Sequence, residues 1–183
     1  MSGSGEQADR SGLGLVQLYT GDGKGKTTAA LGMALRAAGW GYHTFVCQFM
    51  KGQDYGELHS IPLLGPFVTI EQFGQPSFLR LEDIQPRDIA LAKRGMDRAR
   101  EVIGSGLYEI VVLDEICMIV YFRLVALAEV LQLVAGRPPG VELVLTGRRA
   151  PQALIDCADL VTEMIEVKHP YQRGIGARRG IES

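Results

Sequence analysis

Cysteine is scarce in this sequence, and the few copies present do not suggest pairing. Cys47, Cys117 and Cys157 form no C-x-x-C motif, and an odd number argues against a framework of disulfide bonds. This pattern favours a reducing compartment, and we therefore expect the protein to be cytoplasmic.

Long apolar runs and an excess of charge are also missing. No stretch approaches the roughly 18 consecutive apolar residues that span a bilayer, so we expect no membrane segment. The formal net charge is −2, which gives no overall basic field for nucleic acid, although a local basic patch is not excluded. We therefore expect no nucleic-acid partner.

The first residues differ in composition from the rest of the chain. Met1–Ser11 is rich in glycine and serine and lacks the apolar core of a signal peptide. We expect residues 1–12 to form a disordered lead-in and residues 13–183 to form one domain, because 183 residues suffice for a single buried core.

Short β-rich segments alternate with helical segments through that domain. The expected strands are Leu15–Tyr19, Thr44–Met50, Phe67–Phe73, Ile110–Leu113, Glu142–Thr146 and Leu160–Val167. The expected helices are Thr27–Ala38, Ile84–Ile103, Leu124–Val134 and Pro151–Ala158. Ile84–Ile103 is the clearest helix, because its apolar residues recur at three- and four-residue steps and Pro86 suits its first turn. The alternation predicts an α/β fold: a parallel β-sheet flanked by helices on both faces.

A glycine-rich loop joins the first strand to the first helix. Its sequence is Thr20-Gly21-Asp22-Gly23-Lys24-Gly25-Lys26-Thr27-Thr28. Glycines let backbone N–H groups face phosphate oxygens, Lys26 adds a positive charge, and the Thr27 hydroxyl can bind Mg²⁺. Thr20 takes the place of the first glycine of the common pattern G-x-x-x-x-G-K-[ST], and a glycine-rich turn with a chance lysine is the alternative. Because strand, loop, Lys-Thr pair and helix coincide, we predict a P-loop NTPase-like fold with an ATP site at Gly21, Asp22, Gly23, Lys24, Gly25, Lys26, Thr27 and Thr28.

Two acidic residues follow the apolar strand Ile110–Leu113. In an open α/β sheet, strand ends such as this deliver side chains to the edge where ligands bind. Asp114 or Glu115 could therefore hold Mg²⁺ together with Thr27. Two solvated acids at a strand end are the alternative, and the phosphate loop upstream favours the metal site.

These motifs resemble, as an ordered set, the ATP:corrinoid adenosyltransferases of the CobA/BtuR type. The resemblance rests on the phosphate loop, Cys47-Gln48-Phe49-Met50-Lys51-Gly52, Val112-Leu113-Asp114-Glu115, Leu145-Thr146-Gly147-Arg148, Ala158–Glu163 and Val167–Tyr171. It runs from about Leu15 to Ile181. The chain departs from the family pattern at Cys117 and Met118, where the family usually has a polar and then an aromatic residue.

The resemblance implies a reaction and its substrates. The family transfers the 5′-deoxyadenosyl group of ATP to Co(I) of a corrinoid such as cobalamin and releases triphosphate. It further implies Mg²⁺ or Mn²⁺ as the metal, a homodimer, and a flavoprotein as a possible reductant.

Roles for individual residues follow from the same resemblance. Lys26 and Arg148 would act on the triphosphate, and Glu115 would be the direct metal ligand. Phe73 and Phe78 would contact the corrinoid, with core packing as the alternative for each. Lys51 could meet the corrinoid, the nucleotide or only solvent, and Arg148 could be a solvated turn residue.

Two other functions stay open from the sequence. A P-loop ATPase or kinase would share the loop and the metal, and a non-catalytic regulator would bind ATP or corrinoid without turnover. The basic segment from Lys168 onward either is solvated or folds over the nucleotide. His43, His59 and His169 show no spacing typical of a metal site, and we interpret Cys47 and Cys117 as packing residues.

Overall fold

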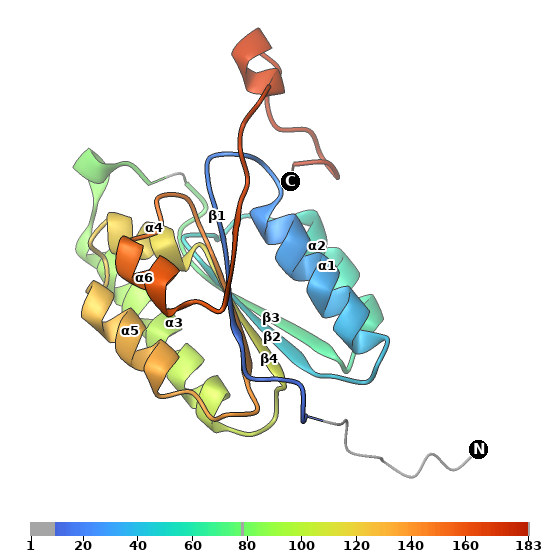
Figure 1. Cartoon of the computed structure of the whole chain (residues 1–183). Coiled ribbons are helices and arrows are strands. Elements are labelled where there is room, and N and C mark those ends of the chain that lie inside the picture. The colour runs from blue at the N-terminus through green and yellow to red at the C-terminus, as the bar shows by residue number, and fades with distance from the viewer. Residues whose placement is uncertain (1–9, 78, 183) are drawn as a thin grey trace.

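Six parallel strands form one sheet, which lies between two layers of helices in the computed structural model (Figure 1). The structure describes residues 10–77 and 79–182. The strand order is β3-β2-β4-β5-β1-β6. This architecture confirms the expected α/β fold with a parallel sheet covered on both faces. Most of the expected lead-in, residues 1–9, lies outside the described part.

All six expected strands are present. They are β1 (Val16–Thr20), β2 (Thr44–Phe49), β3 (Val68–Phe73), β4 (Ile110–Asp114), β5 (Glu142–Thr146) and β6 (Leu160–Glu163). The last strand was expected to continue to Val167, and that expectation is wrong. The chain leaves the sheet at Met164, whose carbonyl oxygen accepts a hydrogen bond from the N–H of Gly23 at 2.7 Å.

In the described part of the chain, six α-helices connect or follow the strands. They are α1 (Lys26–Ala38), α2 (Gly56–Ser60), α3 (Pro86–Gly104), α4 (Ile116–Tyr121), α5 (Leu127–Ala135) and α6 (Gln152–Cys157), with short 3₁₀ turns at Ile61–Leu64, Leu81–Asp83 and Pro170–Arg173. Four of these helices were expected, whereas α2 and α4 were not. Across residues 10–77 and 79–182, no helix has both the length and the apolar character needed to cross a membrane.

Local chemistry explains where two of the expected helices begin later than the pattern suggested. The α3 helix begins at Pro86 because Gln85 caps it, and the Gln85 N–H donates to the Asp88 carboxylate at 2.9 Å. The α5 helix begins at Leu127 because the preceding Leu124 N–H donates to the Ile119 carbonyl oxygen at 2.9 Å, which closes a turn after α4.

The two faces of the sheet have different cores. Alternate residues along each strand point to opposite faces, so Phe45 and Cys47 of β2 pack with α3, α4 and α5, whereas Val46 packs with α1. The α1 side is lined by small residues, among them Ala30 and Ala34, which allow the helix to lie close to the sheet. The beginning of α1, and with it the phosphate loop, is thereby fixed against the sheet.

Candidate active site

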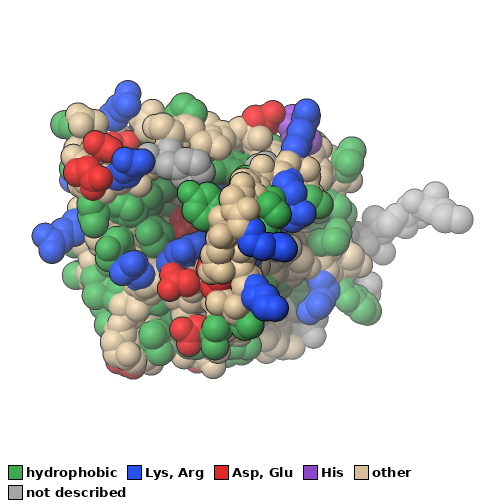
Figure 2. Space-filling model, turned by 90° about the horizontal axis from the view of Figure 1, so that it is seen from above, with side chains coloured by type: hydrophobic (Ala, Val, Ile, Leu, Met, Phe, Trp, Pro, Cys, Tyr) green, Lys and Arg blue, Asp and Glu red, His purple; other side chains and the backbone are tan. Residues whose placement is uncertain are grey.

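The carboxyl ends of β1, β4 and β5 bring the three sequence motifs to one edge of the sheet (Figure 1). When the molecule is viewed from above, looking onto this edge, Lys and Arg side chains gather near the middle of the face, with Asp and Glu side chains beside them (Figure 2). A pocket of about 710 Å³ opens here, which is within the usual range for a small-molecule site. It is lined by Gly23, Lys24, Gly25, Lys26, Thr27, Thr28, Leu31, Lys51, Tyr55, Gly56, Glu57, Ser60, Glu115, Arg148, His169, Gly180, Ile181 and Glu182.

The phosphate loop wraps around the ammonium group of Lys26. The Lys26 Nζ donates to the carbonyl oxygens of Gly21 and Gly23, each at 2.7 Å. Burial lowers the pKa of this lysine. Gly21 and Gly25 have φ values of 91° and 121°, which favour glycine. The loop thus holds a buried cation directly below the pocket, as anion binding requires.

The glycines of this loop also make room for the chain after β6. A Cβ atom on Gly21 would lie 2.4 Å from the Met164 carbonyl oxygen, and one on Gly23 would lie 2.7 Å from the same atom. A Cβ atom on Gly25 would lie 3.2 Å from the Met164 sulfur. No sequence pattern predicts this contact, because Met164 is 141 residues beyond Gly23 (164 − 23). The glycines are therefore required by packing as well as by phosphate geometry.

Asp114 is the centre of a buried polar network. Its Oδ1 accepts hydrogen bonds from the hydroxyls of Thr27 at 2.9 Å and Thr146 at 2.7 Å. Its Oδ2 accepts from Lys51 Nζ at 2.8 Å and from Gln48 Nε2 at 3.3 Å. Because Asp114 has no solvent-exposed surface, these donors replace the water that its charge would otherwise need. The structure thus places the Thr27 hydroxyl against Asp114, one of the two acids singled out from the sequence.

Glu115 differs from its neighbour in both position and partners. Its backbone is left-handed, with φ of 62°, and this conformation places it at the pocket wall where α4 begins. Its N–H donates to the Thr146 hydroxyl at 2.8 Å. Burial, and next the charge of Asp114, raise the pKa of the Glu115 carboxyl. Asp114 therefore organises the site from below, whereas Glu115 faces the pocket.

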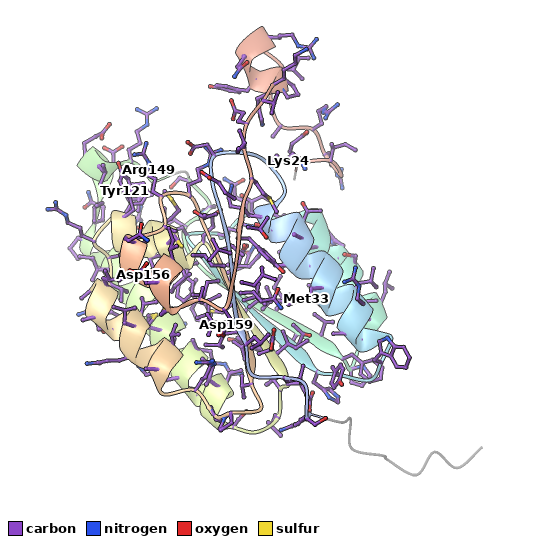
Figure 3. All side chains as sticks on the ribbon, in the orientation of Figure 1. Lys24, Met33, Tyr121, Arg149, Asp156 and Asp159 are labelled. Atoms are coloured by element: carbon purple, nitrogen blue, oxygen red, sulfur yellow. The ribbon has the colours of Figure 1, made fainter. Side chains whose placement is uncertain are left out.

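The Thr-Gly-Arg turn closes the pocket on the β5 side. Arg148 is half-exposed, lines the pocket and lies 3.7 Å from Asp22, so it can swing toward a ligand. Gly147 has φ of 140°, and a Cβ there would lie 2.7 Å from the Cβ of Cys117. The next residue, Arg149, turns away and stacks over the Tyr121 ring at 4.8 Å (Figure 3). Of the two arginines, Arg148 is thus the one available to the pocket.

Lys51 reaches the same network from the end of β2. It lies 3.3 Å from the Thr27 hydroxyl and 3.8 Å from Glu57, and its ammonium is 5.2 Å from the centre of the Tyr55 ring. Burial alone would lower the pKa of Lys51, but the charge of Asp114 and its hydrogen bond outweigh burial, so the pKa is raised. The structure therefore places Lys51 on the phosphate side of the pocket.

Sequence reasoning missed two members of this network, Gln48 and Glu57. Gln48 is fully buried, donates to Glu57 at 2.9 Å and accepts from Gln72 at 3.0 Å. One signal was available, because a glutamine within the otherwise apolar end of a buried strand needs a polar partner. Glu57 had no such signal, since it lies on the short α2 helix that the pattern did not predict.

Comparison with known proteins identifies the family to which this site belongs. The model of the family "ATP:corrinoid adenosyltransferase BtuR/CobO/CobP" matches residues 12–183. The chain belongs to this family. The corrinoid adenosyltransferase of Sinorhizobium sp. is 37% identical over 172 residues, which cover 92% of this chain and 80% of that protein. Corrinoid adenosyltransferase CobA of Salmonella typhimurium is 34% identical over 170 residues, covering 92% and 85%, and the Pseudomonas aeruginosa corrinoid adenosyltransferase is 35% identical over 174 residues, covering 94% and 85%.

Of the two aromatic residues for which the resemblance implied contact with the corrinoid, the structure describes Phe73. Phe73 is buried, with its ring 6.4 Å from that of Phe49, and Gly95 of α3 packs against it. The structure thus places Phe73 in the core, apart from the phosphate pocket. Phe78 lies outside the described residues.

The C-terminal segment of the adenosyltransferase chain returns to the phosphate loop. It rises above the sheet after Met164, and its end comes back over the beginning of α1 (Figure 1). Gly180, Ile181 and Glu182 line the pocket together with His169. The end of the segment therefore lies at the pocket, whereas its basic side chains, Lys168, Arg173, Arg178 and Arg179, are exposed.

The oxygen atoms at and just below the pocket fit a hard divalent cation. Thr27, Asp114 and Glu115 offer hydroxyl and carboxylate oxygens, which are the ligands that Mg²⁺ prefers. No group of three or more His, Cys, Asp and Glu residues that could hold a metal occurs among residues 10–77 and 79–182. An ion bound by one or two protein oxygens and by phosphate oxygens needs no such group. Cys47 and Cys117 are fully buried, as expected for packing residues.

Proposed function

We propose that this chain transfers the 5′-deoxyadenosyl group of ATP to Co(I) of a corrinoid and releases triphosphate. The observation that carries the proposal is the family match over residues 12–183, which includes the whole phosphate pocket. The names of the relatives describe the same activity.

The proposed reaction makes specific demands on the protein. Cobalt(I) supplies an electron pair to the ribose C5′ carbon, the bond between C5′ and its oxygen breaks, and triphosphate leaves with the electrons of that bond. The reactive nucleophile belongs to the corrinoid, so the protein needs no general base. It must orient C5′ toward cobalt and stabilise the charge that develops on the departing triphosphate.

The residues around the pocket are suited to stabilising the charge on the departing triphosphate. Lys26 and the N–H groups at the start of α1 present positive charge to phosphate oxygens. Arg148 lines the same pocket, 3.7 Å from Asp22 of the loop, and can form two parallel hydrogen bonds with phosphate. Asp22, Lys24 and Thr28 belong to the same loop and would complete the nucleotide site.

A magnesium ion is part of this proposal. Thr27 with Asp114 or Glu115 would hold it, and manganese would be accepted by the same oxygen ligands. Bound there, the ion would neutralise charge on the triphosphate. Asp114 lies directly against Thr27, whereas Glu115 faces the pocket, so the two acids would contribute from different sides.

The remaining parts of the proposal come from the family resemblance. We propose a homodimer and a flavoprotein as the source of reducing electrons. The cytoplasmic location is proposed from the three unpaired cysteines instead. The corrinoid would approach from the segment after β3 that contains Phe78. Phe73 is buried in the core cluster, which favours the packing role that the sequence left open for it.

The products of the reaction test the proposal. Anaerobic incubation with ATP, Mg²⁺ and chemically reduced cobalamin should yield a light-sensitive adenosylcorrinoid and triphosphate in equal amounts, with little ADP. Without corrinoid, ATP should stay essentially intact, because no other nucleophile is positioned at C5′. Rapid ADP formation without corrinoid, and no cobalt–carbon product when corrinoid is added, would replace the transferase with a P-loop ATPase. Binding of both ligands without turnover would replace it with a regulator.

A further inference from the structure

Lys51 occupies an unusual position for a lysine beside a phosphate loop. Its ammonium nitrogen lies 2.8 Å from Asp114 Oδ2 and 3.3 Å from the Thr27 hydroxyl oxygen. Both residues belong to the proposed metal site, in which Thr27 is joined by Asp114 or Glu115. Only 14% of the Lys51 side chain is exposed, and none of Asp114 is. The cation that neutralises the buried Asp114 charge in this structure is therefore part of the protein.

A divalent ion held by Thr27 and Asp114 would meet Lys51 at the same carboxylate. The metal ion and the Lys51 ammonium would repel one another strongly at such a short distance, because water is largely excluded there. We propose that Lys51 and the metal ion are alternative partners of Asp114, so that Lys51 sets the metal affinity of the nucleotide-free enzyme. This inference rests on the proposed metal site, and it assigns a positioning role to a residue that the resemblance linked to the corrinoid.

The surroundings of Lys51 give its ammonium another place to go. Glu57 on α2 is 3.8 Å away, and the Tyr55 ring lies 5.2 Å from the nitrogen. Both residues line the pocket, as Lys51 itself does. A four-carbon side chain can therefore exchange Asp114 for Glu57 or for a phosphate oxygen without leaving the pocket. Binding of the nucleotide would then favour binding of the metal ion, because the nucleotide offers the displaced Lys51 ammonium a new partner.

Glu57 is itself held in place for this exchange. Gln48 Nε2 donates to Glu57 at 2.9 Å and also lies 3.3 Å from Asp114 Oδ2, and Gln48 is fully buried. Strand pairing places Gln48 directly beside Asp114 in the sheet. The two carboxylates that share Lys51 are thus joined by one fixed amide group.

Manganese binding to the nucleotide-free protein tests the proposal without measuring activity. The electron paramagnetic resonance signal of free Mn²⁺ would be followed during titration of the wild-type chain and of Lys51→Met, Lys51→Arg and Lys24→Met. We expect Lys51→Met to bind Mn²⁺ about tenfold more tightly than wild type, because the competing cation is gone. Lys51→Arg keeps the charge and should stay within about threefold of wild type. Lys24→Met is the matched control, since it removes a lysine of the same pocket that has no hydrogen bond to Asp114, and it should change affinity by less than about threefold.

Thermal unfolding separates this role from a merely structural one. With a chelator present, Lys51→Met should unfold at a lower temperature than wild type, because Asp114 loses its ion pair. Added Mg²⁺ should stabilise Lys51→Met more than it stabilises wild type. A loss of stability that Mg²⁺ does not reduce would assign Lys51 to the scaffold and overturn the proposal.

The same Mn²⁺ titration, extended to variants of the acidic residues, distinguishes failure of this inference from failure of the metal site. If Lys51→Met binds Mn²⁺ no more than about threefold more tightly than wild type, while Asp114→Asn loses binding, the metal site stands and the competition is refuted. If Asp114→Asn binds Mn²⁺ as well as wild type, with or without ATP, while Glu115→Gln loses binding, the metal site stands on Glu115 and the inference is refuted. If both variants bind Mn²⁺ as well as wild type, the proposed metal site is wrong and the inference falls with it. If Lys51→Met does not fold, Lys51→Gln provides a polar replacement for the same titration.

Discussion

Replacement of Gly23 by alanine should destabilise the protein even without any nucleotide. The added Cβ would lie 2.7 Å from the carbonyl oxygen of Met164, 2.8 Å from its carbonyl carbon and 2.9 Å from that of Ile165. All three are backbone atoms, so no flexible side chain can move aside. Gly23 does not adopt the left-handed conformation, and therefore the contact, not backbone strain, decides the outcome.

The expected magnitude follows from two opposing effects. Forcing a methyl group into a close-packed contact costs about 1–3 kcal/mol. Alanine also restricts the unfolded chain, which returns about 0.4–1 kcal/mol. We therefore expect a net loss of about 1–2 kcal/mol in the free energy of unfolding, together with weaker ATP binding, because the Gly23 carbonyl oxygen also positions Lys26.

Equilibrium urea unfolding, followed by circular dichroism without metal or nucleotide, measures this loss. Gly32→Ala is the matched control, since Gly32 lies on the exposed side of α1 and a Cβ there would meet nothing within 4 Å. That variant should be stabilised by about 0.5–1 kcal/mol. A loss of unfolding free energy in Gly23→Ala together with a gain in Gly32→Ala would support the close contact between Gly23 and Met164. A Gly23→Ala protein as stable as wild type would refute it, and would show that the segment after β6 does not rest on the loop.

Three more outcomes can be measured. Lys26→Ala should slow single-turnover adenosyl transfer roughly a hundredfold, about 3 kcal/mol, because it removes charge from the triphosphate; an unchanged rate would refute the phosphate-loop assignment. Burial alone would raise the pKa of Glu109, but hydrogen bonds from the His43 N–H and the Arg10 guanidinium outweigh burial and lower it from 4.5. Glu109→Gln should therefore cost about 2 kcal/mol of stability above pH 4.5, and the difference from wild type should shrink as pH falls below that value, whereas a pH-independent difference would exclude the charge as its cause. One thiol, that of Cys157, should react with a thiol reagent in the native protein and three in the unfolded chain, and Cys157→Ser should remove the native reaction; a second rapidly reacting thiol would contradict the burial of the other two.

The sequence alone was enough to predict the strands and the phosphate loop. Both depend on neighbouring residues: apolar runs bounded by turns for the strands, and glycines with Lys26 and Thr27 between a strand and a helix for the loop. The carboxyl-edge position of Asp114 and Glu115 followed from the same local pattern together with the geometry of parallel sheets.

Helix α4 shows where local pattern stopped being informative. Its sequence, Ile116–Tyr121, is apolar at nearly every position, so it has no helical periodicity and could equally have extended a strand. The left-handed backbone at Glu115 ends β4 and starts the helix, and the pattern carried no sign of that turn.

Only the tertiary structure decided which partners the site residues have. Lys51 could face a corrinoid, a nucleotide or solvent until strand pairing placed β2 beside β4 and brought it to Asp114, 63 residues further along the chain. Met164 against Gly23, and Phe73 in the core, depend equally on contacts between distant segments. Residue type and spacing specify local conformation and which chemical groups are available, but the distance between two such groups is set by the strand order and register of the whole sheet.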